Sequence, residues 1–194
     1  NTHLLSLQNK LYLGKFKLDL NSAFQNTELI HFAEAAVFEI QMKLATLTYE
    51  AKLHLPSNKN SEYILGFQGF NQKNTNLNDR ETKLLPDAIT NSNSVFGLIQ
   101  YTFYSKLKVQ TGLRYDQKNI SSQSIGLAEM PEFRPAIDRS YGSFSGSLGA
   151  TYNVSEELLF RTNFAAAYRT PNLAELTSNG QHELRFEVGD SRLV

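Results

Sequence analysis

Apolar and polar side chains alternate with a period of two along most of this chain. Between Leu47 and Leu55, leucine, tyrosine and alanine hold the odd positions, and threonine, glutamate, lysine and histidine hold the even ones. Successive side chains of a β-strand point to opposite faces, so each such stretch predicts a strand with one apolar and one polar face. We expect about eight strands, at Leu4–Leu13, Lys15–Leu29, Val37–Leu55, Glu62–Gln72, Ser94–Tyr104, Leu107–Lys118, Tyr141–Asn153 and Leu158–Tyr168, and a further one beginning around Leu184.

The lengths of the strands and of their connections favour a membrane barrel. Each stretch lasts about ten residues or more, which is the length that a tilted membrane strand needs. Long polar connections alternate with short ones: the long ones cover Asn71–Asn93 and Gln117–Ser140, and the short ones lie at Gly14, Pro56–Asn60, Ser105–Lys106 and Val154–Glu157. Short turns at one end and long loops at the other are typical of outer-membrane barrels. Tyrosines near strand ends fit an interfacial girdle: Tyr63, Tyr101, Tyr104, Tyr115, Tyr152 and Tyr168.

A soluble antiparallel sandwich or barrel is the alternative, because alternation alone does not tell inward from outward. The polar face is dense in serine, threonine, asparagine, glutamine, lysine and arginine, as a wet lumen would be, but a solvent-exposed face looks the same. The lack of tryptophan counts mildly against a membrane girdle. Strand length and loop asymmetry favour the membrane.

Composition narrows the function classes. The 19 Lys and Arg residues balance the 19 Asp and Glu residues, so no net charge attracts nucleic acid. The chain has no cysteine, which excludes disulfides, thiol nucleophiles and iron–sulfur ligation. No apolar run approaches the roughly 18 residues of a membrane helix. A mean hydropathy of -0.36 is compatible with a membrane barrel, whose apolar residues occupy alternate positions.

No catalytic or metal motif is complete, so we expect no enzyme, no metal site and no cofactor. The four histidines are scattered, at His3, His31, His54 and His182. The pair His182–Glu183 begins like a zinc-protease motif, but Phe186 takes the place of the second histidine. The stretch from Gly142 to Gly146 resembles a nucleophile elbow except that its centre is a phenylalanine.

The end of the chain carries the most specific motif. An alternating strand leads into a proline-stiffened, glycine-containing segment, whose marked residues are Arg169, Pro171, Asn172, Glu175, Leu176, Gly180, His182, Glu187 and Gly189. In this order they resemble the C-terminal barrel signature of TonB-dependent outer-membrane receptors. Weaker echoes lie at Thr111–Asp116 and Phe24–Asn26.

The resemblance implies an all-β fold. Residues 1–194 would be part of a transmembrane β-barrel of about 22 strands, an antiparallel up-and-down meander without the plug domain and without the last strands. An isolated piece of this kind has two open sheet edges, through which we expect it to associate.

The resemblance also implies a function. It is the import of a scarce ligand (a ferric siderophore, haem or cobalamin) across the outer membrane of a Gram-negative bacterium. The partners implied are outer-membrane lipid, the small ligand and the TonB complex, which supplies energy through the plug region. Which ligand is imported, and which residues bind it, the sequence leaves open. The alternatives are a small passive outer-membrane barrel and a soluble antiparallel β-sheet module that binds or adheres.

Two roles are open for the charged residues Arg169, Glu175 and His182. In the first, Pro171 and Asn172 shape a turn, and an Arg169–Glu175 ion pair holds the segment in place. In the second, these residues line a ligand passage or contact a plug.

Overall fold

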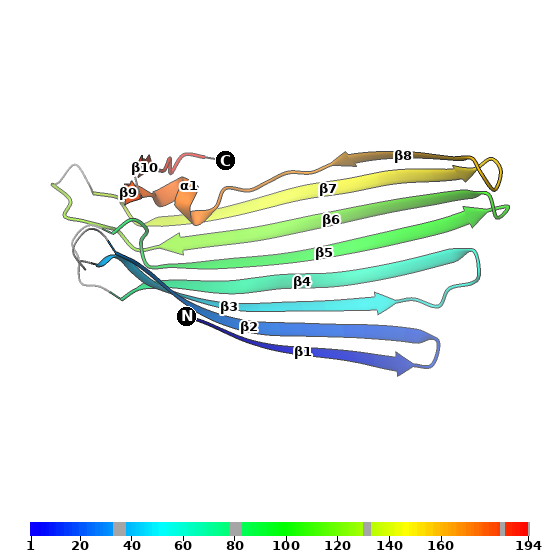
Figure 1. Cartoon of the computed structure of the whole chain (residues 1–194), viewed down its shortest axis with the longest axis horizontal. Coiled ribbons are helices and arrows are strands. Elements are labelled where there is room, and N and C mark those ends of the chain that lie inside the picture. Colours follow the sequence, from blue (N-terminus) through cyan, green and yellow to red (C-terminus); the bar gives the residue numbers. More distant parts are fainter. Residues whose placement is uncertain (33–37, 78–82, 130–132, 183–184, 194) are drawn as a thin grey trace.

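Eight long antiparallel strands form one sheet in chain order. The computed structural model describes residues 1–32, 38–77, 83–129, 133–182 and 185–193. The strands are β1 (Thr2–Leu13), β2 (Phe16–Phe32), β3 (Phe38–His54), β4 (Ser61–Asn76), β5 (Ala88–Phe103), β6 (Leu107–Ser122), β7 (Ile137–Asn153) and β8 (Leu159–Ala166) (Figure 1). The predicted up-and-down meander of about eight long strands is confirmed.

The chain beyond β8 leaves this sheet. It forms a short helix, α1 (Leu173–Thr177), and a small hairpin of β9 (Asn179–His182) and β10 (Arg185–Val188), which pair with each other. The predicted start of a further strand, Leu184, lies outside the described residues. The strand observed nearby, β10, belongs to the small hairpin and not to the long sheet. Within the described part of the chain, no helix is long and apolar enough to cross a membrane.

The register places like side chains side by side. Tyr115 of β6 lies opposite Val95 of β5 on one side and Phe144 of β7 on the other, and the Tyr115 and Phe144 rings are 4.7 Å apart. Asp116, the next residue, lies opposite Ser94 and Ser143. Cross-strand neighbours of this kind stabilise a sheet, and they give it one apolar and one polar face.

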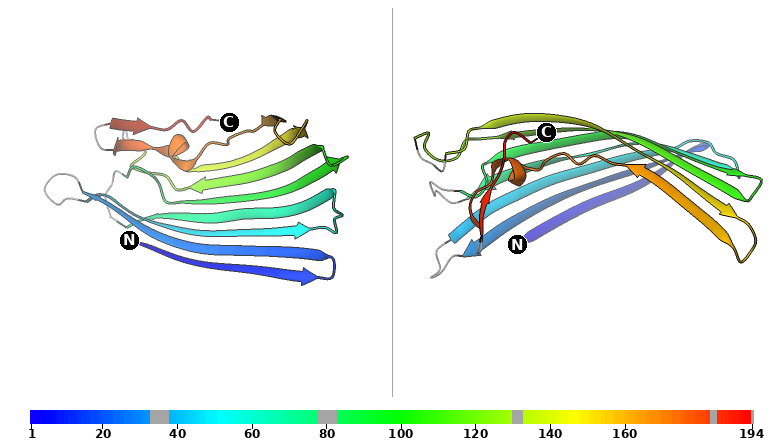
Figure 2. Two further views of the ribbon diagram at one scale, coloured as in Figure 1. Left: turned by 45° about the vertical axis from the view of Figure 1, so that its right-hand side comes forward. Right: turned by 90° about the horizontal axis from the view of Figure 1, so that it is seen from above.

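The sheet is curved, and its polar face is the concave one. Figure 2 shows α1 and the small hairpin on the concave side of the trough formed by the long strands. Lys118, which belongs to the polar set of β6, donates a hydrogen bond to the Pro171 carbonyl there at 2.8 Å. The apolar set therefore lies on the convex side, where Phe144 and Phe164 are 79% and 72% exposed. A soluble sandwich would bury these rings, so the structure does not support that alternative.

The apolar belt of the convex face covers only part of each strand. On β6 it runs from Leu107 to Tyr115, beyond which the convex positions are the polar Gln117, Asn119 and Ser121. From Leu107 to Tyr115 the strand advances eight residues, which is about 26 Å at ~3.3 Å per residue. At a strand tilt of ~40° this length corresponds to about 20 Å along the barrel axis. This height is close to the ~25 Å apolar band of outer-membrane barrels.

The strands continue past the belt, which corrects the predicted loops. The connection predicted at Asn71–Asn93 spans residues 77–87, and the one predicted at Gln117–Ser140 spans residues 123–136. The alternation vanishes there because the convex positions of the extensions carry polar side chains, as at Gln117, Asn119 and Ser121 of β6. Cross-strand polar contacts hold the extensions, for example Gln117 Nε2 donating to Ser140 Oγ at 2.7 Å. Tyr115 was predicted to lie near a strand end. It lies in the middle of β6, where the apolar belt ends and the polar extension begins.

An arginine substitution should lower the free energy of unfolding more on the convex face than on the concave face. Ile99 and Gln100 are neighbours at mid-belt on β5, on the convex and concave faces respectively. We expect Ile99→Arg to lower the free energy of unfolding in phospholipid vesicles by about 2–4 kcal/mol, because arginine would enter hydrocarbon. The matched control Gln100→Arg should cost less than about 1 kcal/mol. Equal losses in denaturant titrations of the two variants would contradict the assignment of faces.

Candidate functional site

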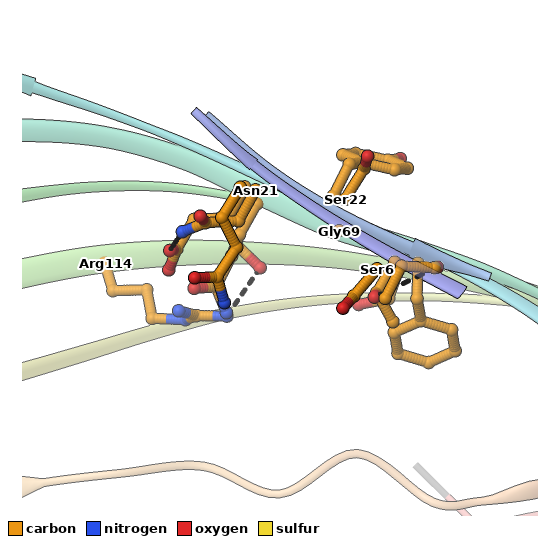
Figure 3. Close-up of a pocket in the computed structure, with 14 residues that line it drawn as sticks. Ser6, Asn21, Ser22, Gly69 and Arg114 are labelled. Carbon is orange, nitrogen blue, oxygen red and sulfur yellow. Dashed lines mark hydrogen bonds between the residues drawn. The ribbon is translucent and has the colours of Figure 1, made fainter. Parts of the chain in front are cut away.

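The concave face carries a continuous wall of polar side chains. A cavity of about 370 Å³ lies against it, lined by residues of β1 to β6. Figure 3 shows Ser6, Asn21 and Arg114 projecting from the same side of the sheet, whereas Ser22 projects from the other side. The wall is the surface on which a polar ligand or a polar partner segment would lie.

Arg114 is the centre of the wall. Its guanidinium donates to Asp116 through Nε and Nη2, at 2.8 and 2.7 Å, and Nη2 also donates to Ser94 Oγ at 2.7 Å. The Gln68 amide, oriented with its oxygen toward the guanidinium, accepts from Nη1 at 2.8 Å and Nη2 at 2.9 Å. Phe96 lies beneath, with its ring centroid 6.0 Å from Cζ of Arg114. The guanidinium is therefore fixed, and Asp116 compensates its charge.

A second group of charges lies closer to the short turns. Asp19 accepts from Lys17 at 3.2 Å and contacts His54 Nε2 at 2.8 Å. Beside it, Glu50 pairs with Lys52 at 2.7 Å and accepts from Asn21 at 3.0 Å. Each of these carboxylates has a cation beside it, so this part of the wall is close to neutral.

Glycines let two large apolar side chains lie flat on the wall. Phe96 covers Gly66, whose missing side chain would collide with the phenylalanine ring. Leu98 covers Gly112, where an added Cβ would come within 2.7 Å of Leu98 Cδ2. Because the glycines have no side chain, Phe96 and Leu98 lie along the sheet and do not project into the space in front of the wall.

Residues 167–182 and 185–193, here called the strap, fold over the end of the wall that lies opposite the short turns. Asn172 caps the start of helix α1: its side chain accepts from the Glu175 backbone at 2.9 Å, and the Glu175 carboxylate accepts from the Asn172 backbone at 2.9 Å. This reciprocal capping box explains why a helix of five residues starts at this point.

The predicted Arg169–Glu175 ion pair is present. The Arg169 guanidinium, with help from the Asn172 backbone N–H, holds the pKa of the Glu175 carboxyl below its usual range. Both residues consequently stay charged at neutral pH. The Arg169 side chain is 74% exposed, so the pair adds little to stability.

An apolar contact docks the strap onto the sheet. Leu176, only 1% exposed, packs with Ile120 of β6 and with Ile137 and Tyr141 of β7, and Leu173 packs against the same cluster. These sheet residues belong to the concave set, and they cluster at the end of the sheet opposite the short turns. Burying a leucine stabilises a contact by about 1.5–3 kcal/mol, which makes Leu176 the main anchor of the strap.

Polar contacts and one glycine complete the docking. The strap carbonyls of Pro171, Ser191 and Leu193 accept from Lys118, Arg139 and Tyr141 at 2.8, 2.7 and 3.2 Å. Gly189 lies against the backbone of α1, where an added Cβ would come within 2.6 Å of Thr177 N and 2.7 Å of Leu176 C.

The nine residues of the C-terminal motif all lie within the strap. Arg169, Pro171, Asn172, Glu175, Leu176 and Gly189 come together around α1. Gly180 and His182 lie in β9, and Glu187 lies in β10 opposite Gly180. The described residues bring no three histidine, aspartate or glutamate side chains into a metal-binding group.

The sequence did not single out Arg114 and Lys118. Their position on the polar face was visible from the alternation, but their partners come from other strands and from the strap. The feature of the sequence that could have marked them as candidate site residues is a positively charged side chain in the middle of a strand's polar face.

The fit of Gly189 against α1 can be tested. We expect Gly189→Ala to detach the strap, because its Cβ would collide with backbone atoms, at a cost of about 1–3 kcal/mol. Hydrogen exchange of residues 173–182 should accelerate accordingly. The control Gly97→Ala places a Cβ at an ordinary 3.6 Å from Leu65 and should leave exchange unchanged. Unaltered exchange in Gly189→Ala would contradict this packing.

Comparisons with known proteins agree with the geometry. The family model described as TonB dependent receptor-like, beta-barrel, matches residues 4–191. A search of curated proteins found no match. The match covers almost the entire chain, and the meander of long strands with an apolar convex belt is the architecture such a barrel requires. The chain belongs to the TonB-dependent receptor-like β-barrel family.

Proposed function

We propose that this chain is a wall segment of an outer-membrane importer that takes up a scarce ligand with energy supplied through TonB. The family is one of outer-membrane transport receptors of Gram-negative bacteria, and it is not an enzyme family. The observation that carries the proposal is the family match together with the distribution of side chains. Hydrocarbon would contact the convex belt, and a water-filled lumen would contact the wall around Arg114.

The chain forms one part of a larger barrel in this proposal. β1 and β8 are the two edges of the sheet. In a membrane, the outward-facing backbone N–H and C=O groups of an unpaired edge strand would have no hydrogen-bond partner, which is energetically costly. Further strands would pair with both edges, and a plug would occupy the lumen and carry the contact with the TonB complex. An isolated copy of residues 1–194 would associate through the same edges.

The strap occupies the position of an external loop. It follows β8 at the end of the sheet opposite the short turns, which in outer-membrane barrels are periplasmic. Because it folds over the wall instead of extending outward, it narrows the entrance to the lumen. The ligand would be a ferric siderophore, haem or cobalamin, and it would pass between the strap and the opposite side of the barrel.

Growth experiments test the proposal. A strain that lacks the gene should fail to grow when one of these ligands is the sole source of iron or cobalamin, and inactivation of TonB should cause the same failure. Expression of the intact gene should restore growth. A Leu176→Asp variant, with the strap anchor removed, should restore uptake incompletely, whereas Leu113→Ile on the convex face should restore it fully.

Two results would contradict the proposal. Growth that is normal on every ligand would argue against import of these compounds. Uptake that persists without TonB would identify a passive barrel instead, because energy coupling is what separates the two functions.

A further inference from the structure

A second cavity lies between the wall and the strap. It has a volume of about 450 Å³ and is bounded on one side by β5, β6 and β7 and on the other by residues 167–170 and Asn172. The side chains that matter to its chemistry are Arg114, Asp116, Lys118, Ser143, Ser145 and Arg169. The cavity exists only because the strap is docked, since the sheet alone supplies one of its two sides.

The charges that line this cavity are not balanced. Asp116 compensates Arg114, and Glu175, which lies next to the cavity, compensates Arg169. Lys118 is half-buried, and among the described residues its hydrogen-bond partner is a neutral carbonyl, that of Pro171. One positive charge is therefore left in a partly desolvated space, which is the arrangement that attracts an anion.

Hydroxyl groups add donors beside this charge. Ser143 lies across from Asp116 on β7 and is 8% exposed, and Ser145 follows on the same face of the strand. Within the part of the chain that the structure describes, neither hydroxyl makes a side-chain hydrogen bond. Both serines line the cavity, so each hydroxyl can donate a hydrogen bond to an acceptor bound there.

We propose that this cavity binds a small anion through carboxylate or phosphate oxygens. Lys118 supplies the compensating charge, and the hydroxyls of Ser143 and Ser145 donate hydrogen bonds. The assignment of this anion to the imported ligand rests on the proposed import function and would make that ligand negatively charged. The site itself rests only on the geometry of the wall and the strap.

Binding of two probes tests the site. Equilibrium dialysis of the complete receptor in detergent against citrate and against pyrophosphate should show saturable binding of one of them. Citrate binding alone would identify carboxylate chemistry, and pyrophosphate binding alone would identify phosphate chemistry. Saturable binding of neither probe at millimolar concentration overturns the proposal.

Variants locate the site. Lys118→Gln keeps an N–H donor for the Pro171 carbonyl but removes the charge, and it should weaken binding about tenfold. Lys118→Arg should retain binding. Lys108→Gln is the matched control, because Lys108 lies on the same face of the same strand but outside the cavity. An equal loss in Lys118→Gln and Lys108→Gln, or no loss in Lys118→Gln, overturns the proposal.

A second pair of variants tests the hydroxyls. The double variant Ser143→Ala with Ser145→Ala should also weaken binding, and the control Ser147→Ala, on the same face of β7, should not. An unchanged affinity in the double variant contradicts the assigned role of the two serines. Far-ultraviolet circular dichroism and heat-modifiable migration on gels confirm that each variant is folded.

The outcomes separate the site from the import function. A receptor that imports its ligand with TonB but binds neither probe retains the proposed function and loses the anion site. A receptor that binds a probe through Lys118 but supports no TonB-dependent uptake retains the anion site and loses the proposed function.

Discussion

The fold depends on one constraint, which is that backbone N–H and C=O groups in a membrane must find partners within the protein. Hydrocarbon offers no hydrogen bonds, so strands that cross it must pair along their whole length. The register of this sheet meets that requirement without interruption from β3 to β7. Once the strands are paired in this way, the period of two fixes which side chains contact lipid and which contact water. The wall around Arg114 is a consequence of this pairing.

The membrane-spanning part of the fold could be predicted from the sequence because one face differs from the other. Leu107, Val109, Leu113 and Tyr115 alternate with Lys108, Gln110, Arg114 and Asp116, and the structure has β6 there. The signal ends where the difference ends. Gln117, Asn119 and Ser121 are as polar as a loop, although they continue the strand to Ser122. Period-two reasoning detects a strand whose two faces differ in the usual way, and it misses one whose convex face has become polar.

The strap was predictable only in its local features. The asparagine and glutamate of the capping box are three residues apart, and the ion pair Arg169–Glu175 is also local in sequence. The direction in which the strap folds depends on contacts between Leu176 and residues 35 or more positions earlier. No local pattern marks Ile120, Ile137 and Tyr141 as the surface on which a later helix will pack. Lys118 and Pro171 are 53 positions apart in the sequence, so no local pattern indicated the cavity between them.

The two kinds of contact in the strap have different consequences. The Arg169–Glu175 pair is exposed to solvent, where an ion pair contributes little, whereas Leu176 is buried against the sheet. The apolar anchor thus sets the position of the strap, and the ion pair contributes little to it. Lys118 donates a hydrogen bond to a strap carbonyl and also lines the cavity. The shape of the cavity therefore depends on the docking of the strap. A change that moves α1 away from the wall therefore removes one side of the cavity, whatever its effect on the barrel.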